Sequence, residues 1–427
     1  METFLRSGCL ERVTSKQPVR TREPERRQGI FVFQIPEDQL AENHTARVLW
    51  RLVETLDLSG FVEDTKSVQG HCGRDRLSVK MLLTLWLYAI SRGISSAREI
   101  ERLSKSDDAF RWIVGDQTVS HATLSGFRVG YRAALEQLMT DILGALLQQG
   151  LVELDFVGQD GTRIRASASA PSFRSEAALQ QCLEQAALHV KAVMAEADDP
   201  EATNAEKTAR LAAAQDYQQR VQRAIEVVHE LKANGKEKPR ASTTDSDARI
   251  MKMGDGGFRP AYNIQLATAG FPMGGPRTIV GLRVTNEGTD MGSLTPMLQE
   301  VEQRTGQTPH TILADAGHAN HECICNLMDH NILPLVSVPE PSKTPGLGAN
   351  FEPKVDAWRE VMQTEQAQDL YRNRAGLCEL PNAHFKSRFG LERFLVRGLD
   401  KVTCVVLITS IASNLLAHGH KLLGMIG

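Results

Sequence analysis

The sequence predicts an α/β protein in which a mixed sheet follows an all-helical N-terminal region and is interrupted by a helical hairpin. Three observations predict this fold. Apolar residues recur at three- and four-residue steps over much of residues 45–147, as on amphipathic helices. Apolar runs near residues 156, 262, 278, 311 and 332 are typical of strands. Residues 171–240 are rich in Ala, Gln, Glu, Lys and Arg and carry a heptad-like seam.

The composition indicates a soluble globular protein. The 427 residues suffice for two or three domains, and 41% hydrophobic with 24% charged residues is ordinary. A net charge of -3 means that any nucleic-acid footprint must be local. Seven cysteines without a repeated spacing favour a reducing cytoplasm over a disulfide framework. No signal peptide is evident, and the apolar run 402–417 is shorter than the ~20 residues that span a bilayer. We therefore expect no membrane partner and a buried C-terminal helix.

The chain begins with a polar stretch and continues as helices. Residues 1–29 mix arginines with glutamates and predict a flexible tail, and Ile30–Phe33 is a short strand-like run. Helices are expected from Thr45 and over Ser78–Ile90. Together, residues 30–150 form the expected helical domain.

A helix-turn-helix-like unit is expected within this domain. Ser96 can cap a short helix, and Ser120 can cap a long one that starts at His121 and runs towards Leu147. Short helices with tight polar turns suit DNA binding, which would place the side chains of His121, Thr123 and Arg128 near a groove. A small helical domain that binds nothing fits the same pattern.

Residues 151–427 form the expected sheet domain, with the hairpin over 171–240 inserted in it. The hairpin arms face each other through apolar positions that step by three and four, and Asp199-Pro200 makes the turn. Strands are then expected over Tyr262–Thr268 and Thr278–Thr285, and a helix starts at Asp290 or Ser293. Later strands and helices alternate, which predicts a mixed α/β sheet.

Three carboxylates in separate stretches are the candidate catalytic and metal-binding residues. An apolar strand ends at Asp160, where Gly161 would break it, and a second strand ends at Asp315. Glu379 lies in a basic stretch that is expected to be helical. Carboxylates are ligands that Mg²⁺ prefers, and two ions about 3.5–4 Å apart serve phosphoryl transfer. The sequence therefore predicts a two-metal site.

The neighbours of these carboxylates admit simpler interpretations. Lys386 follows Glu379 by seven residues on nearly the same helical face and could hold a phosphate, although a solvated basic helix fits equally. Of the competing carboxylates, Asp290 is more simply a helix cap and Asp255 a turn residue.

Zinc and thiol chemistry are weaker alternatives. His318, His321, Cys323 and Cys325 form one short segment whose Cys-x-Cys gap is too tight for a usual zinc site. Cys378 has no evident histidine partner, so a packed residue is expected rather than a nucleophile.

In combination these motifs resemble those of DDE-type transposases of bacterial insertion sequences. The resemblance covers residues 30–417, including the helical region 50–128, which resembles the family's DNA-binding domain. Tyr371, Arg374, Glu379 and Lys386 match the family's Tyr-Arg-Glu-Lys signature. The other matching motifs are Asp160–Ala166, Asp245–Arg249 with Gly256–Asn263, Ala314–Gly317 and Phe394–Val402. His318 departs from the pattern, because many relatives are expected to have Tyr there.

The resemblance implies a ribonuclease-H-like core that cuts and joins DNA at the terminal inverted repeats of a mobile element. It implies two Mg²⁺ ions, with Mn²⁺ able to substitute, on Asp160, Asp315 and Glu379. It also implies that Arg374 and Lys386 contact DNA phosphates beside Tyr371. A homodimer would act on terminal-repeat and target DNA in the bacterial cytoplasm, at the nucleoid. A DNA-binding relic or repressor without catalysis, and a nuclease that cuts without joining, are the alternatives.

Overall fold

The computed structural model describes residues 35–62, 76–115, 117–195, 203–271, 274–338 and 352–426. The expected tail 1–29, the run Ile30–Phe33 and the turn Asp199-Pro200 lie outside these ranges.

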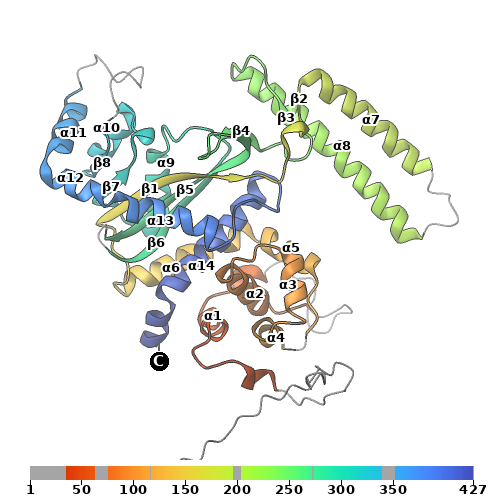
Figure 1. Ribbon diagram of the computed structural model, residues 1–427, viewed down its shortest axis with the longest axis horizontal. Coiled ribbons are helices and arrows are strands. Elements are labelled where there is room, and N and C mark those ends of the chain that lie inside the picture. The colour runs from red at the N-terminus through yellow and green to blue at the C-terminus, as the bar shows by residue number, and fades with distance from the viewer. Residues whose placement is uncertain are drawn as a thin grey trace, which may run out of the picture.

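A six-stranded mixed sheet forms the centre of the molecule (Figure 1). The central strand β1 pairs antiparallel with β5 on one side and parallel with β7 on the other. β8 adds to β7 in parallel, whereas β4 and β6 both pair antiparallel with β5. The strands are β1 (Phe156–Arg165), β4 (Arg249–Lys252), β5 (Phe258–Phe271), β6 (Gly274–Thr285), β7 (Thr311–Ala314) and β8 (Leu333–Val336). The predicted mixed sheet is confirmed, with β5 and β6 extending beyond the predicted strands.

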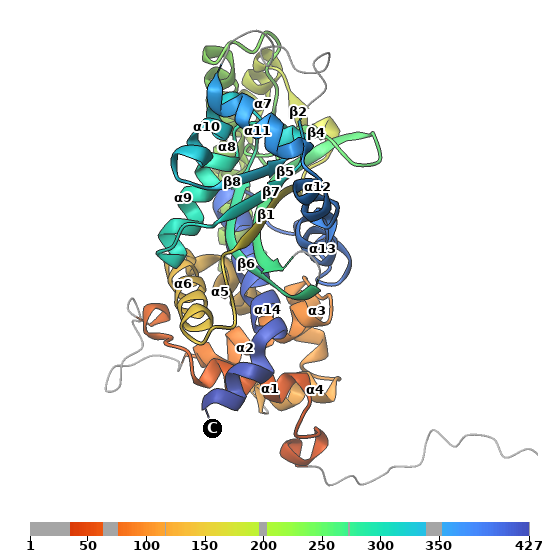
Figure 2. The same cartoon turned by 90° about the vertical axis from the view of Figure 1, so that its left-hand side faces the viewer.

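Two layers of helices cover this sheet. Figure 2 shows α9 (Leu294–Thr305) and α13 (Arg374–Ser387) on opposite faces. A Cβ on Gly158 of β1 would lie 2.6 Å from the Cys378 sulfur, so the absence of a side chain lets α13 approach β1 closely. The remaining C-terminal helices before residue 399 are α10 (His321–Asp329), α11 (Pro353–Gln363) and α12 (Glu365–Arg372), with a 3-10 turn η5 (Ala316–His318).

The N-terminal region is helical, as predicted. Ser96 and Ser120 accept hydrogen bonds from the backbone of Glu99 and Thr123, which confirms both caps. The helices are α1 (Thr45–Glu54), α2 (Val79–Ser91), α3 (Ala97–Leu103), α4 (Asp108–Val114), α5 (His121–Gly130) and α6 (Arg132–Gln148), with 3-10 turns η1 (Pro36–Gln39) and η2 (Ser59–Phe61).

The predicted single helix from His121 towards Leu147 is wrong. It is broken at Tyr131, whose φ of -126° and ψ of 47° are not helical. The Tyr131 ring packs against the rings of Phe61 and Phe127 and its hydroxyl contacts Arg76. These long-range contacts outweigh the local tendency of the segment to continue as one helix.

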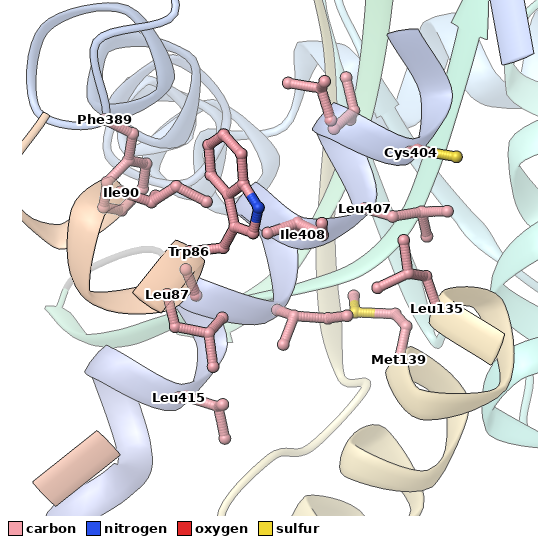
Figure 3. Packing of buried hydrophobic residues seen from close by; sticks show 14 of the residues in the cluster. Trp86, Leu87, Ile90, Leu135, Met139, Phe389, Cys404, Leu407, Ile408 and Leu415 are labelled. Carbon is pink, nitrogen blue, oxygen red and sulfur yellow. The ribbon is translucent and has the colours of Figure 1, made fainter. Parts of the chain in front are cut away.

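The C-terminal helix α14 (Leu399–Ile426) joins the helical region to the sheet. Figure 3 shows its Leu407 and Ile408 packed among Trp86 of α2 and Leu135 of α6. By length and composition alone α14 could span a membrane, but 83% of its most apolar window is buried inside the protein. The predicted buried C-terminal helix is confirmed, and it is longer than the apolar run 402–417.

The predicted helical hairpin is also present. It consists of α7 (Glu176–Ala195) and α8 (Asn204–Ala233), and the small strands β2 (Phe173–Arg174) and β3 (Ala241–Ser242) pair at its base, after a 3-10 turn η3 (Ala170–Ser172). Leu179 of one arm packs with Val221 and Val228 of the other. The hairpin projects away from the sheet (Figure 1), so its arms stabilise each other rather than the central core.

Candidate functional site

Asp160 lies in the middle of β1 rather than at its end, which corrects the sequence prediction. β1 continues through Gly161 to Arg165, and Asp160 is opposite Leu266 of β5. A Cβ on Gly161 would lie 2.2 Å from the Gln265 amide nitrogen and 2.5 Å from an Asp290 oxygen. Gly161 therefore permits a close side-chain approach and does not break the strand.

The Asp160 carboxylate is held on the α13 side of the sheet. The Asn382 side-chain amide donates to Asp160 Oδ2 at 2.9 Å, and the Gly161 N–H donates to Oδ1 at 2.8 Å. Burial raises the pKa of Asp160, and the negative charge of Asp315 raises it further. Asp160 is thus a desolvated carboxylate with a second carboxylate beside it.

Asp315 follows β7 directly and caps the turn η5. The parallel pairing of Gly158 with Leu313 brings it to the level of Asp160. The Gly317 N–H donates to Asp315 Oδ1 at 2.9 Å, and His318 Nδ1 lies 2.7 Å from the same oxygen. The hydrogen bond with His318 lowers the pKa of Asp315, so this carboxylate of the pair remains ionised.

His318 connects Asp315 to a buried polar network on the opposite face of the sheet. It is fully buried, and its Nε2 lies 3.2 Å from the Gln265 side-chain oxygen. The Gln265 amide donates in turn to Asp290 at 2.6 Å. The prediction that Asp290 caps α9 is wrong, because Ser293 occupies the N-cap and Asp290 accepts from Asn263 and Gln265 instead. The contacts of His318 therefore link Asp315 to Gln265.

Glu379 reaches this region from α13 through Arg374. The Arg374 guanidinium donates to Glu379 at 2.7 Å and lies within electrostatic range of both Asp160 and Asp315. It also lies 5.8 Å from the centre of the Tyr371 ring, a cation–π distance. The Glu379 side chain is 56% exposed, so it can rotate away from Arg374. The three predicted carboxylates are thus gathered around one positive side chain.

Lys386 lies at the other end of the site. It is half-buried on α13, where burial lowers the pKa of its amine and the Asp160 charge counteracts this effect. Among the residues that the structure describes, no three His, Cys, Asp or Glu side chains converge as a ready-made metal site. Asp160 and Asp315 can hold a cation together, and Glu379 can join them after its side chain turns from Arg374.

The residues predicted to contact DNA divide into two groups. His121 and Thr123 are exposed at the start of α5, where His121 Nδ1 lies 2.6 Å from a Glu101 oxygen. Arg128 is only 5% exposed, stacks 4.4 Å from the Trp86 ring and donates to the Ser95 carbonyl at 2.7 Å. Burial lowers the pKa of Arg128 to about 10. Arg128 is therefore mostly engaged with the protein itself, and its role as a DNA contact stays a prediction.

Asn382 was missed by the sequence prediction. It lies three residues after Glu379 and four before Lys386, and residues with this spacing share a helical face. The spacing is visible in the sequence, but an uncharged amide gives no sign there that it pairs with Asp160.

The sulfur and histidine alternatives have structural explanations. Burial raises the pKa of Cys378 to about 12, and its thiol lies 3.6 Å from the Leu313 carbonyl, as expected for a packed residue. Both ring nitrogens of His318 already have partners, and Cys323 is buried against Thr295.

Comparison with known families gives two matches. Residues 34–129 match the family described as "Transposase domain (DUF772)", and residues 232–415 match the family described as "Transposase DDE domain". The second match includes Asp315 and Glu379, whereas Asp160 precedes it. No curated protein matches the chain, and no solved structure does.

Proposed function

We propose that this chain, which belongs to the DDE-type transposases of insertion sequences, cleaves and joins DNA at the terminal inverted repeats of its element. A DDE domain implies a ribonuclease-H-like fold, and the mixed sheet around β1 agrees with this. The observation that carries the proposal is that Asp160 of β1 and Asp315, which follows the neighbouring strand β7, lie near enough for the charge of Asp315 to raise the pKa of Asp160.

The acidic pair fits a hard divalent cation. Two carboxylates in a partly buried site repel each other, and a cation removes this penalty. Asp160, Asp315 and Glu379 would hold two Mg²⁺ ions, for which Mn²⁺ can substitute. When bound, the ions activate the attacking oxygen and stabilise the leaving oxygen of an in-line displacement.

The chain's own side chains orient the acidic pair and the DNA. Asn382 fixes one Asp160 oxygen, and His318 fixes Asp315. Arg374 and Lys386 lie beside the pair and are positioned to bind the phosphates next to the bond that is cut. Cleavage breaks a P–O bond when water attacks phosphorus, and joining repeats the displacement with a 3′-hydroxyl as the attacking group.

Substitution of the three carboxylates tests this proposal. Asp160→Ala, Asp315→Ala and Glu379→Ala should each abolish Mg²⁺-dependent cleavage of a duplex that carries the inverted repeat flanking the gene. Binding of the same duplex should persist, because the helical region is unchanged. Cleavage that survives in any of the three variants would contradict the assignment of that residue.

The wild-type protein separates the alternatives. Repeat-end binding without cleavage in Mg²⁺ or Mn²⁺ would identify a relic or repressor, and cleavage without joining would identify a nuclease. We expect a homodimer on DNA in the bacterial cytoplasm, because two element ends must be brought together. Sedimentation of the protein with and without the duplex measures this.

A further inference from the structure

A groove lies beyond the far end of β1, between the sheet domain, the hairpin and the helical region. Its volume is about 500 Å³, and its walls include Ser125 of α5, Arg220 of α8 and Ser167. Arg397 and Lys401 form part of the same wall, from the loop before α14 and its first turn. Three parts of the chain that are distant in sequence therefore meet at one hollow.

The groove has an excess of positive charge. Arg220 is paired with Asp216 at 2.9 Å, and Asp245 accepts from Tyr262 and the Gly398 backbone. Arg397 and Lys401 are exposed, and neither forms an ion pair within the described ranges. At the start of α14, Asp247 accepts from the Leu399 N–H at 2.9 Å, so its carboxylate binds the helix backbone. Arg397 and Lys401 are therefore the exposed cations of the groove that are not engaged in a salt bridge among the described residues.

One further arginine lies next to the groove. The Arg393 backbone forms a parallel β-bridge with Arg165 at the end of β1, and its exposed side chain donates from Nε to the Ala166 carbonyl at 3.3 Å. A guanidinium has further N–H groups that can donate to a phosphate. The Arg165 side chain lies on the other face of β1 from Asp160, because side chains alternate along a strand. Arg393, Arg397 and Lys401 are together called the basic track.

The length of the track suits a polyanion. The groove begins at Ser167, seven residues after Asp160, or about 23 Å at roughly 3.3 Å per residue. A DNA strand carries one phosphate per ~3.4 Å, so about seven nucleotides would cover this distance. At the far end, Ser125 lies one helical turn after His121, whose side chain is exposed at the start of α5.

We infer that the basic track and its groove bind the phosphate backbone of DNA about seven nucleotides from the bond that is cut. Arg397 and Lys401 contact phosphates irrespective of base sequence, and they guide the strand from the acidic pair to α5. This inference rests on the proposed function for the position of the cut, but its binding test does not require cleavage.

The salt dependence of DNA affinity tests the inference. The Arg397→Ala/Lys401→Ala double variant, the wild type and Lys421→Ala are titrated with a short random-sequence duplex at several salt concentrations. Lys421 is the matched control, because it is an exposed lysine on the same helix, 20 residues later, or about 30 Å at 1.5 Å per residue. The plot of log K against log salt has a negative slope, and each lost phosphate contact should make this slope shallower by about 0.9.

In the double variant the slope should be shallower by about 1.8, because two contacts at about 0.9 each are lost. The slope of Lys421→Ala should equal that of the wild type. Arg397→Lys/Lys401→Arg keeps both charges and should keep the wild-type slope, which separates lost charge from lost folding. A wild-type slope in the folded double variant would overturn the inference. If the wild-type protein binds with the expected slopes but never cuts, the proposed function fails while the groove stands. If the wild-type protein cuts DNA but the folded double variant keeps the wild-type slope, the proposed function stands and the inference about the groove fails.

Discussion

Asp160 is a partly buried carboxylate and Asp245 a buried one beside the central strands, and their surroundings differ in one decisive respect. Asp245 accepts hydrogen bonds from the Tyr262 hydroxyl at 2.7 Å and the Gly398 N–H at 3.1 Å. Asp160 accepts from Asn382 but also faces the negative charge of Asp315. Burial raises the pKa of both. A buried carboxylate with protein donors anchors the fold, whereas one facing a second carboxylate is suited to bind a cation.

The largest expected effect separates the two aspartates by activity. Asp160→Asn removes a charge that the proposed reaction requires, and should slow Mg²⁺-dependent cleavage at least 10³-fold, about 4 kcal/mol in the barrier. Asp245→Asn should slow cleavage no more than about tenfold, because Asp245 does not face the acidic pair. Single-turnover rates on the terminal-repeat duplex measure both variants. Equal losses would remove the distinction between the two sites.

A second variant tests how the acidic pair is positioned. His318→Phe removes both polar contacts of a fully buried side chain and frees Asp315 to rotate. Such supporting contacts typically contribute 10–100-fold in metal affinity or activity. We expect a loss in this range that excess Mg²⁺ partly restores.

His318→Asn serves as the conservative comparison for that experiment. It can keep a donor towards Asp315 and should retain more activity than His318→Phe. Substitution of the exposed His330 by Asn should have no effect. A similar loss in all three variants at every Mg²⁺ concentration would show that His318 does not position the carboxylate.

The anchoring aspartate is tested through its partner. Tyr262→Phe deletes the hydroxyl that donates to Asp245, and the carboxylate then loses a buried hydrogen bond. Loss of one partner of a buried polar group typically costs about 1–3 kcal/mol. Urea unfolding should show this decrease in the free energy of unfolding, while the cleavage rate of the folded protein should change little. An unchanged urea midpoint would mean that the Tyr262 hydroxyl contributes nothing to the stability of the fold.

The sequence could predict features that depend on local pattern. The alternation in β5 and β6, the seam of the hairpin, and the small residues around Asp315 all reflect local periodicity or short-range turns. Features that depend on tertiary contacts were missed. Gly161 looks like a strand breaker until Gln265 and Asp290 are brought beside it. Arg128 looks like an exposed base until Trp86 covers it. The candidate carboxylates were identifiable, but their supporting amide and histidine contacts were not.

The smallest expected effect is a pH dependence of stability at Asp245. Burial raises its pKa in the folded protein, so the fold favours the neutral carboxyl group. The contribution of Asp245 to the free energy of unfolding is fully present below the unfolded pKa of about 3.9, and it is lost as the pH rises through the folded pKa. The loss is at most about 1.4 kcal/mol per pH unit. Asp245→Asn cannot ionise, so its stability relative to the wild type should improve as the pH rises from 4.

Asp255 provides a control of opposite sign for this experiment. Its hydrogen bond from Arg259 lowers its pKa to about 2, so its contribution is present above the unfolded value and is lost as the pH falls. Asp255→Asn should therefore lose stability relative to the wild type as the pH rises from 2 to 4. Urea unfolding across both pH ranges gives the two differences. If the stability of both variants relative to the wild type changes in the same direction with pH, burial does not raise the pKa of Asp245 as proposed.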